Sequence, residues 1–513
     1  MADEPDETPI DPSPPPAERP RKRRVGRRVF YGFLGLWLVV ALWNLYKPLP
    51  EGTGIRGEIV ETPLNQLRFY SDVTGADVFG APVVHHQIFD SMLRVVGEAR
   101  QYVILDFFLF NGQRGAATDV RPRRELSIEL RDALLARKRA VPDLKVLVIS
   151  DPINDLYGSL PSRDFAQLRG AGIDVVDVDL DSLRDSNAIY SSLWRITTKW
   201  WAGDGSGDPW LPNPLDAGPE QVSFGAWARL LNFKADHRKV LIADDGRGGI
   251  TGIVTSLNPH DASSLHCNVA LQVSGPALLP LLASELTIAR DSGWRGDWEP
   301  PAPAPARPVA NPAEAARVQV LTEHEIGAAI ERNFAGARAG DSIDIAMFYL
   351  SDRDVIEALL AAAKRGVSVR VILDPNKDAF GREKDGIPNR SVATELAAAS
   401  NGAIKVRWFR THGEQFHTKI VALRTQNEYW FTLGSANLTR RNIGAYNLEA
   451  NLGVSVPPTS ELANSINAWY EMLWTNKGPP DLEYTAEFGA YADPAQGTYW
   501  LYRLMEVSGL STF

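Results

Sequence analysis

The sequence contains two histidine–x–lysine triplets in matching surroundings, and this pairing constrains the fold more than any other feature. Residues 237–239 read His-Arg-Lys and precede the apolar run 240–243, while residues 417–419 read His-Thr-Lys and precede the apolar run 420–423. Side chains alternate between the two faces of a strand, so the histidine and lysine of each triplet are predicted to point into the same space. Single triplets of this kind are frequent by chance, whereas two in matched positions indicate a duplication.

The surroundings of the triplets follow an α/β pattern that occurs twice. In each half a predicted helix lies between two apolar runs that read as buried strands. The first set comprises residues 102–110, 124–140 and 144–150, and the second comprises 342–349, 352–365 and 367–373. The repeated order predicts two α/β domains of related structure.

The spacing of polar residues after each triplet supports the same conclusion. Asn258 follows His237 at nearly the distance at which Asn437 follows His417, and each asparagine closes a Ser-x-Asn sequence that begins at Ser256 or Ser435. Ten residues beyond these asparagines stand Asn268 and Asn447. Landmarks in the same order on both sides make an internal duplication the simplest interpretation.

The chain divides into five predicted segments. They are a disordered acidic, proline-rich and then basic tail over 1–28, a membrane anchor over 29–46, a first domain over 60–298, a Pro/Ala linker over 299–314, and a second domain over 315–513. The first domain contains a tryptophan-rich insertion at about 185–230, which is interpreted either as part of the core or as an aromatic loop that covers the active site or enters a lipid interface.

The apolar segment 29–46 is long enough to span a bilayer and follows a dense basic cluster at 21–28. No small-x-small cleavage site follows it, which disfavours a removed signal peptide. Positive charge before the span predicts a cytoplasmic N-terminus. The domains after residue 47 are therefore expected on the outer, extracytoplasmic side of the membrane, with the chain held by a single signal anchor.

Composition is that of a globular protein, and the net charge of −9 gives no support for nucleic-acid binding. The single cysteine, Cys267, excludes an intramolecular disulfide but leaves the redox compartment open. No Asp/Glu cluster has the spacing of a metal site, so neither a metal nor another cofactor is expected. The sequence does not predict the oligomeric state.

The first triplet continues to Asp244 and so matches H-x-K-x4-D in full, and the second is followed by Gly-Ser-Ala-Asn over 434–437. With these motifs the chain resembles the phospholipase D superfamily, from about residue 60 to 480. The resemblance implies a pseudo-twofold pair of α/β domains, preceded here by one transmembrane helix, with a single active site at the domain interface.

The resemblance also implies roles for residues. Histidines and lysines of both triplets form the catalytic set: His237, Lys239, His417 and Lys419. The residues expected to bind the substrate phosphate are Ser256, Asn258, Ser435 and Asn437. One neutral imidazole attacks phosphorus to give a phosphohistidine, the other protonates the leaving group, and the lysines and amides stabilise the charge of the transition state.

The choice of nucleophile is finely balanced. Similar enzymes often use the histidine of the N-terminal half, which favours His237. Glu449 matches the downstream acidic residue of the family, and it is expected to orient His417 and to take part in catalysis, whereas the first half has Ala270 at the place taken to correspond. Asp244 is expected to be structural, and its counterpart in the second half is replaced by Arg424.

Three function classes follow from these patterns. The favoured one is a membrane-anchored phosphodiesterase or transphosphatidylase that acts on phospholipid head groups, including a cardiolipin synthase-like exchange with water or an alcohol as acceptor. The alternatives are a nuclease of the same superfamily and an inactive membrane-bound scaffold. The anchor favours lipid as substrate because it holds the active site against a bilayer.

Overall fold

The computed structural model describes residues 21–76, 82–84, 86–115, 123–202, 205–302, 309, 311, 314–379, 382–383, 385–477, 482–511 and 513. The predicted disorder of residues 1–20 and most of the predicted linker 299–314 therefore lie outside the described residues.

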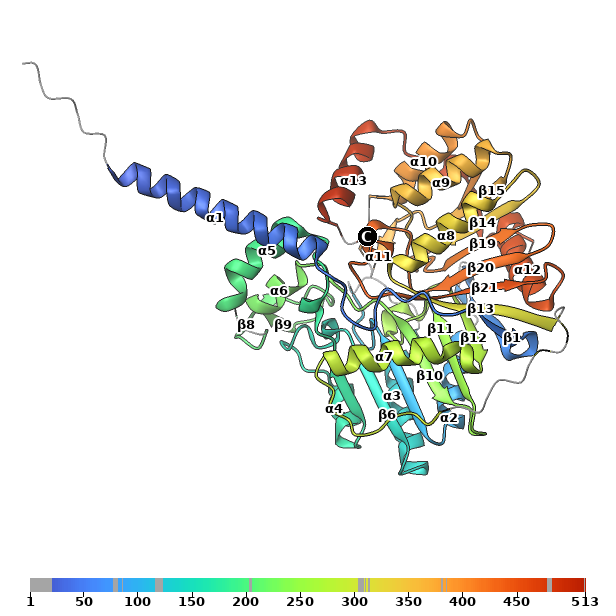
Figure 1. Cartoon of the computed structure of the whole chain (residues 1–513), viewed down its shortest axis with the longest axis horizontal. Coiled ribbons are helices and arrows are strands. Elements are labelled where there is room, and N and C mark those ends of the chain that lie inside the picture. Colours follow the sequence, from blue (N-terminus) through green and yellow to red (C-terminus); the bar gives the residue numbers. More distant parts are fainter. Residues whose placement is uncertain are drawn as a thin grey trace, which may run out of the picture.

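Two large mixed sheets dominate the described part of the chain, one for each half (Figure 1). The first sheet runs β2-β12-β11-β10-β5-β6-β7. Its strands are β2 (Leu67–Asp72), β5 (Tyr102–Phe107), β6 (Lys145–Ser150), β7 (Asp174–Asp177), β10 (Lys239–Asp244), β11 (Ile250–Thr255) and β12 (Asn268–Ser274). The strands β5, β6 and β7 are parallel, and the others pair antiparallel.

The second sheet contains the same arrangement, β13-β21-β20-β19-β14-β15-β18, with β1 and β22 added at its edges. Its strands are β1 (Val60–Pro63), β13 (Ala315–Thr322), β14 (Ser342–Met347), β15 (Ser368–Leu373), β18 (Ile404–Phe409), β19 (Lys419–Arg424), β20 (Tyr429–Gly434), β21 (Ala450–Val456) and β22 (Thr485–Glu487). The chain is thus an α/β protein built from two related halves. The first strand after the anchor, β1, pairs with β13 and belongs to the second sheet.

The sheets pack face to face, and alternation along the strands shows why. On β10, Val240 and Ile242 enter a core that also contains Ile420 and Ala422 of β19, so this core lies between the two sheets. The intervening Leu241 of β10 belongs to a separate outer core. Period-two alternation therefore gives each triplet strand one face toward the other half and one face toward its own helices.

Helices cover the outer faces. The outer core of the first sheet includes residues of α2 (Gln87–Glu98), α3 (Leu126–Ala140) and α4 (Arg163–Gly170). That of the second includes residues of α8 (His324–Gly336), α9 (Arg353–Lys364), α10 (Asn389–Ala399) and α13 (Gln496–Ser508). The helices α7 (Leu279–Asp291) and α12 (Glu461–Thr475) contribute to the core between the sheets, and the short α11 (Arg440–Ile443) follows β20.

Short backbone contacts cross between the halves at the triplets. Asp236 forms a parallel bridge with Leu448, and Phe416 forms one with Cys267. The His237 amide donates to the Leu448 carbonyl over 2.9 Å. Each segment before a triplet is therefore paired with a segment of the other half, which brings both triplets to the interface between the sheets.

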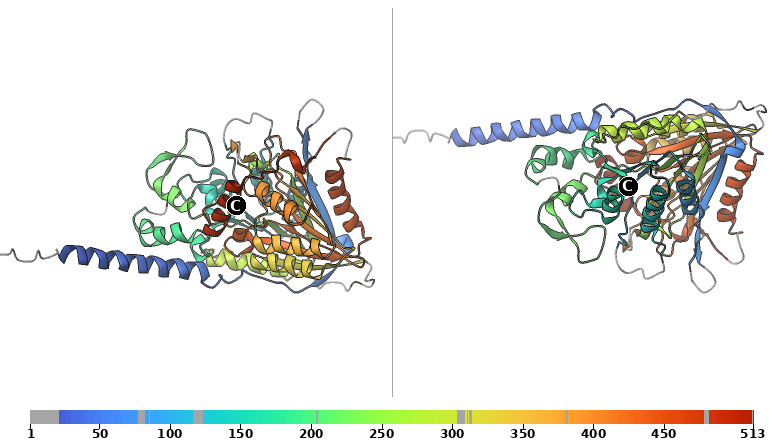
Figure 2. Two further views of the ribbon diagram at one scale, coloured as in Figure 1. Left: turned by 90° about the horizontal axis from the view of Figure 1, so that it is seen from above. Right: turned by 90° about the horizontal axis from the view of Figure 1, so that it is seen from below.

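The N-terminal helix α1 (Arg21–Tyr46) projects from the body, and its stretch Gly26–Tyr46 is long and apolar enough to cross a membrane (Figure 1). Its C-terminal half packs against the tryptophan-rich segment, which folds as α5 (Ala188–Ile196), β8 (Pro209–Pro212), β9 (Gln221–Ser223) and α6 (Phe224–Leu230). Two further views show these elements gathered at the end of the body from which α1 leaves (Figure 2).

Candidate active site

The two triplets have the same local geometry. Lys239 begins β10 and Lys419 begins β19, and each ammonium donates to the carbonyl of the histidine two residues before it, over 2.7 and 3.0 Å. All four side chains are almost fully buried. The lysines are thus held by their own triplets, with the histidine rings directly in front of the strands.

An aromatic ring flanks each histidine. The ring of Phe108 lies 5.0 Å from that of His237, and the ring of Phe348 lies 5.1 Å from that of His417. The lysine ammonium groups lie over the same two rings, at 5.3 and 5.2 Å. These phenylalanines directly follow β5 and β14 at equivalent places. Comparison of the two predicted strand ends in the sequence could therefore have identified them.

Glu449 lies against the histidine of the opposite half. Its Oε1 and Oε2 are 2.8 and 3.0 Å from Nδ1 of His237. The expectation that Glu449 orients His417 is therefore wrong. The reason is the crossed backbone pairing, because residue 448 is bridged to residue 236 and carries the next side chain to the first triplet.

Asn268 holds the corresponding place at His417. Its Oδ1 lies 3.2 Å from Nδ1 of His417, while its amide nitrogen donates to the His266 carbonyl over 3.1 Å. The position in the first half that matches Glu449 is thus Asn268, not Ala270, and Asn268 does not correspond to Asn447. Sequence reasoning named Asn268 only as a landmark and missed this role.

The two serines identify the correct correspondence. Ser256 donates to Asn268 over 2.9 Å and accepts from the Val269 amide over 3.0 Å. Ser435 donates to Glu449 and accepts from the Ala450 amide over 3.0 Å. Each hydroxyl proton is already engaged, so neither serine has a donor left for an anionic phosphate. The expectation that they bind phosphate is corrected: they position the residues that orient the histidines.

The two asparagines of the Ser-x-Asn sequences remain near the site. The side-chain oxygen of Asn258 accepts from the Leu109 amide over 3.2 Å, which leaves its amide nitrogen as a donor. Asn437 is 5% exposed, and among the described residues its Oδ1 has no hydrogen-bond partner. Both therefore stay predictions as phosphate-binding residues.

Burial and like charge control the protonation of the site. Burial lowers the pKa of His237 to about 4, although Glu449 acts in the opposite direction. The pKa of His417 falls well below its usual value through burial and then through Lys419 and His266, with smaller contributions from the first triplet. Burial also lowers the pKa of Lys239 to about 8. Neighbouring cationic groups lower one another's pKa, and a bound anion would stabilise their charged forms.

Glu449 remains the negative partner in this cluster. Burial alone would raise its pKa, but His237, Lys239 and Ser435 outweigh burial, and its pKa lies below the usual range. The side-chain amide of Asn442 also donates to it. An ionised Glu449 holds the His237 proton on Nδ1 and leaves Nε2 with a free lone pair.

Asp244 supports the fold rather than the site. Its carboxylate accepts from the backbone amides of Arg100, Gln101, Tyr102 and Gly246 over 2.7 to 3.1 Å. These bonds fix the turn that leads into β5. In the second half, the guanidinium of Arg424 lies 4.9 Å from the centre of the Tyr429 ring and donates to the Pro458 carbonyl over 3.4 Å.

The Asp244→Ala variant is expected to unfold more easily, by about 2 to 4 kcal/mol, because four backbone amides, one of them fully buried, lose their acceptor. Denaturant titration followed by circular dichroism measures the difference. The matched change Arg424→Ala removes a long side chain without orphaning amides and is expected to cost less than about 1 kcal/mol. Equal losses in the two variants would contradict the structural role of Asp244.

Arg238, the central residue of the first triplet, joins the two halves. Its guanidinium is fully buried and contacts Glu285 of α7 at 3.2 Å and Glu323 at 2.9 Å. Glu323 in turn accepts from the Glu449 amide over 3.0 Å. Arg238 therefore fixes the backbone that presents Glu449 to His237.

Replacing Arg238 by alanine is expected to destabilise the protein by about 3 to 5 kcal/mol, since it leaves two buried carboxylates without their cation. Thermal unfolding in detergent measures the loss. The double change Arg238→Met with Glu323→Gln removes charge from both sides and should recover part of the stability. A single variant as stable as the parent chain would exclude an interdomain role for Arg238.

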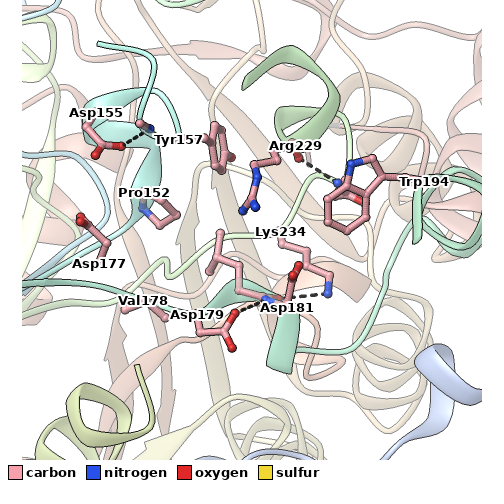
Figure 3. A pocket seen from close by; sticks show the side chains of 13 residues that line it. Pro152, Asp155, Tyr157, Asp177, Val178, Asp179, Asp181, Trp194, Arg229 and Lys234 are labelled. Carbon is pink, nitrogen blue, oxygen red and sulfur yellow. Dashed lines mark hydrogen bonds between the residues drawn. The ribbon is translucent and has the colours of Figure 1, made fainter. Parts of the chain in front are cut away.

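A separate cavity of about 300 Å³ lies where the tryptophan-rich segment meets the first domain (Figure 3). Its lining includes Asp177, Asp181, Trp194, Arg229 and Lys234, and no residue of either triplet. The Lys234 ammonium donates to the Leu183 carbonyl over 2.7 Å and pairs with Asp185 at 2.5 Å. These contacts attach the segment to the domain.

Within the described ranges, no group of three or more His, Cys, Asp or Glu side chains is arranged to hold a metal.

Comparisons with known proteins bear on the fold. Residues 335–474 match the family model described as cardiolipin synthase, PLD-like domain. A search of curated proteins found no match. Among solved structures, the phosphatidylserine synthase of Haemophilus influenzae Rd KW20 is 12% identical, with a TM-score of 0.54 over 91% of this chain and 98% of that one.

Two further structures are similar over smaller parts. A polyphosphate kinase from Porphyromonas gingivalis is 14% identical over 86% of this chain and 53% of its own, with a TM-score of 0.44. A phospholipase D family member from Salmonella typhimurium is 23% identical over 31% of this chain and 95% of its own, with a TM-score of 0.26. Residues 335–474 thus match a phospholipase D-like domain, and the other half repeats its sheet order and its histidine–x–lysine triplet.

Proposed function

We propose that the protein is a membrane-anchored phosphodiesterase or phosphatidyltransferase that acts on phospholipid head groups. The observation that carries the proposal is the crossed pair of His237 with Glu449, set beside two buried lysines. A phosphodiester is the anion that such a site would stabilise, and the apolar helix α1 supplies a means of holding the site at a lipid surface.

In the first proposed step, Nε2 of His237 attacks phosphorus and forms a P–N bond while the bond from phosphorus to the head-group oxygen breaks. His417, protonated on Nε2 once the anionic substrate is bound, gives that proton to the leaving alkoxide. In the second step, water or an alcohol attacks phosphorus, its proton passes to His417, and the P–N bond breaks. Lys239 and Lys419 stabilise the charge on the non-bridging oxygens.

The asymmetry between Glu449 and Asn268 supports this assignment. A carboxylate fixes the tautomer of the nucleophile and stabilises the charge that develops on its ring when it attacks. A neutral amide orients His417 without raising the affinity of its ring for a proton, so the imidazolium of His417 remains a good acid. His237 is therefore assigned as nucleophile and His417 as general acid.

We also propose that the basic residues at the start of α1 lie in the cytoplasm and that both halves lie outside. The support is the positive charge that precedes the apolar stretch. Protease digestion of intact and of permeabilised spheroplasts tests this orientation. Protection of the domains in intact spheroplasts would reverse it.

Purified full-length protein is to be incubated with vesicles of phosphatidylglycerol, phosphatidylethanolamine or cardiolipin, with and without glycerol. Phosphatidic acid or an exchanged head group is the expected product by mass spectrometry, and its absence from the His237→Ala chain is the control. Oligonucleotides and plasmid DNA are tested in the same preparation. Cleavage of nucleic acid with unchanged lipid would replace the proposal by a nuclease, and no turnover of either would leave a scaffold.

The Asn268→Asp variant is expected to move the alkaline limb of the pH–rate profile upward. His417 works in its protonated form, so activity falls as pH rises through its pKa in the substrate complex. A carboxylate beside Nδ1 raises that pKa, by about one to three units, and extends activity to higher pH. The pH dependence of kcat measures the shift, with Asn268→Gln as the neutral control. An unmoved alkaline limb would show that His417 is not the acid.

A further inference from the structure

The end of α1 is fixed to the tryptophan-rich segment by several hydrogen bonds. The Lys47 ammonium donates to the Asp181 carbonyl over 2.9 Å, and the Asp185 amide donates to the Asn44 carbonyl over 2.9 Å. Further along α1, the indole of Trp37 donates to the carbonyl of Ile189 in α5 over 3.2 Å. These contacts hold the end of α1 against the segment and the residues just before it.

This docking determines the depth of α5. The apolar stretch Gly26–Tyr46 has 21 residues, and at about 1.5 Å per residue it only just matches the hydrocarbon thickness of a bilayer. All of it is needed to cross. Because α5 packs beside the part of α1 that begins at Trp37, α5 must lie at the level of the lipid leaflet on the domain side.

The surface around α5 is rich in exposed aromatic and apolar side chains, as a position in the lipid leaflet requires. Trp200, Trp201 and Trp210 are 79%, 68% and 62% exposed. The ring of Trp201 stacks on that of Phe224 at 5.5 Å, and Leu193 of α5 is also exposed. Indoles at this density are unusual on a water-facing surface but are favoured where hydrocarbon meets head groups.

The helix α13 presents a second apolar surface at the same end of the body (Figure 1). Trp500, Leu504 and Val507 are exposed and lie at helical spacing on one side, whereas Tyr502 and Glu506 on the other side are buried. The helix is capped by Gly509, where an added Cβ would meet the carbonyl oxygen of Ser186 at 2.0 Å. Since Ser186 lies just before α5, the C-terminal end of α13 lies against the start of α5.

We propose that α5 with its tryptophans and α13 together form a lipid-contact surface that seats on the leaflet facing the domains. The occupant is the membrane that holds α1, because α1 fixes the distance and orientation of both surfaces. The inference rests on the proposed anchoring of α1 and deepens it: the enzyme binds its membrane through a broad surface as well as through a single helix.

The surface is connected to the active site by a short path. After α13 the chain is held by Arg441, whose guanidinium donates to the Gly509 carbonyl over 2.9 Å. The ring of Phe513 then lies 6.1 Å from that of Tyr349, which in turn contacts Phe348 beside His417. Lipid beside α13 would therefore stand next to the His417 side of the site.

Environment-sensitive labels on full-length protein in proteoliposomes test the surface. Cys267 is buried, so a cysteine introduced by Trp201→Cys or Leu504→Cys provides the exposed thiol for an NBD label. Ser465→Cys on α12, exposed at the other end of the body, is the matched control. Quenching by lipid-attached nitroxides is expected at positions 201 and 504 and absent at 465. Quenching at 201 and 504 only by aqueous iodide would overturn the proposal, as would mutual crosslinking that identifies a second copy as the occupant.

A functional readout separates this inference from the proposed function. The triple change of Trp500, Leu504 and Val507 to glutamine is expected to lower turnover of vesicle lipid about tenfold, because apolar area no longer enters the leaflet. Turnover of a short-chain, monomeric phosphodiester should be unchanged. Equal turnover of vesicle lipid by the triple variant and the parent protein would contradict the lipid-contact surface. A parent protein that turns over neither substrate, but whose labels at 201 and 504 are quenched by lipid nitroxides, would reject the proposed function alone.

Discussion

The His237→Ala variant is expected to lose at least about a thousandfold in kcat on phospholipid, because it removes the proposed nucleophile. The His417→Ala variant should lose a similar factor on natural substrates, whose alkoxide leaving groups need a proton. Initial rates of head-group release measure both losses. The two variants therefore look alike with lipid.

A substrate with a nitrophenolate leaving group distinguishes them. Nitrophenolate departs without a proton, so His417→Ala should still form the phosphoenzyme, and slow breakdown should let it accumulate. His237→Ala should form none. Acid quenching and mass spectrometry of the peptide that carries the modification read out the difference. A phosphohistidine at residue 417, or one that forms in the His237→Ala chain, would reverse the two assignments.

The Glu449→Gln variant is expected to lose about a hundredfold to ten-thousandfold in kcat with little change in KM, because an amide cannot fix the His237 tautomer or stabilise its developing charge. Burial already lowers the pKa of His237 to about 4, with Glu449 opposing that shift. Loss of the carboxylate lowers this pKa further. The acid limb of the pH–rate profile, where neutral His237 becomes protonated, should therefore move to lower pH.

The pH–rate profile of kcat and a thermal unfolding curve provide the measurements. Asn447→Ala, two residues away, is the matched control and should keep most of the activity, since the side chain of Glu449, not that of Asn447, contacts His237. An unaltered kcat in Glu449→Gln would show that the contact with His237 is only structural.

The sequence was sufficient to predict the two halves, whereas the meeting of their triplets at one interface was implied by the family resemblance. Each triplet precedes an apolar strand, and the run of landmarks after it is repeated, so the α/β class and the duplication followed from periodicity. The apolar helix before the domains was equally visible, because its apolar stretch, broken only by Asn44, is as long as a bilayer is thick. These features are local in the chain or repeat within it.

What could not be predicted depends on contacts between the halves. The partner of Glu449 is set by the bridge from Asp236 to Leu448, which no local pattern encodes. The role of Asn268 was hidden by spacing: Ser256 and Asn268 are 12 residues apart, whereas Ser435 and Glu449 are 14 apart. Counting from the second asparagine therefore selected Ala270. The exposed apolar stripe of α13 was likewise not predicted, because the apolar face of an amphipathic helix is expected to pack on the domain.

The crossed bridges at residues 236 and 416 also bear on how such a site can diversify. In a symmetric pair of identical chains, one gene would determine both orienting side chains, and the two histidines would have to share the same chemistry. Fusion of two copies into one polypeptide removes that constraint. Here Glu449 and Asn268 have become different, and each half tunes the histidine of its neighbour. The proposed division of labour between attack and proton transfer would then depend on the covalent link between the halves.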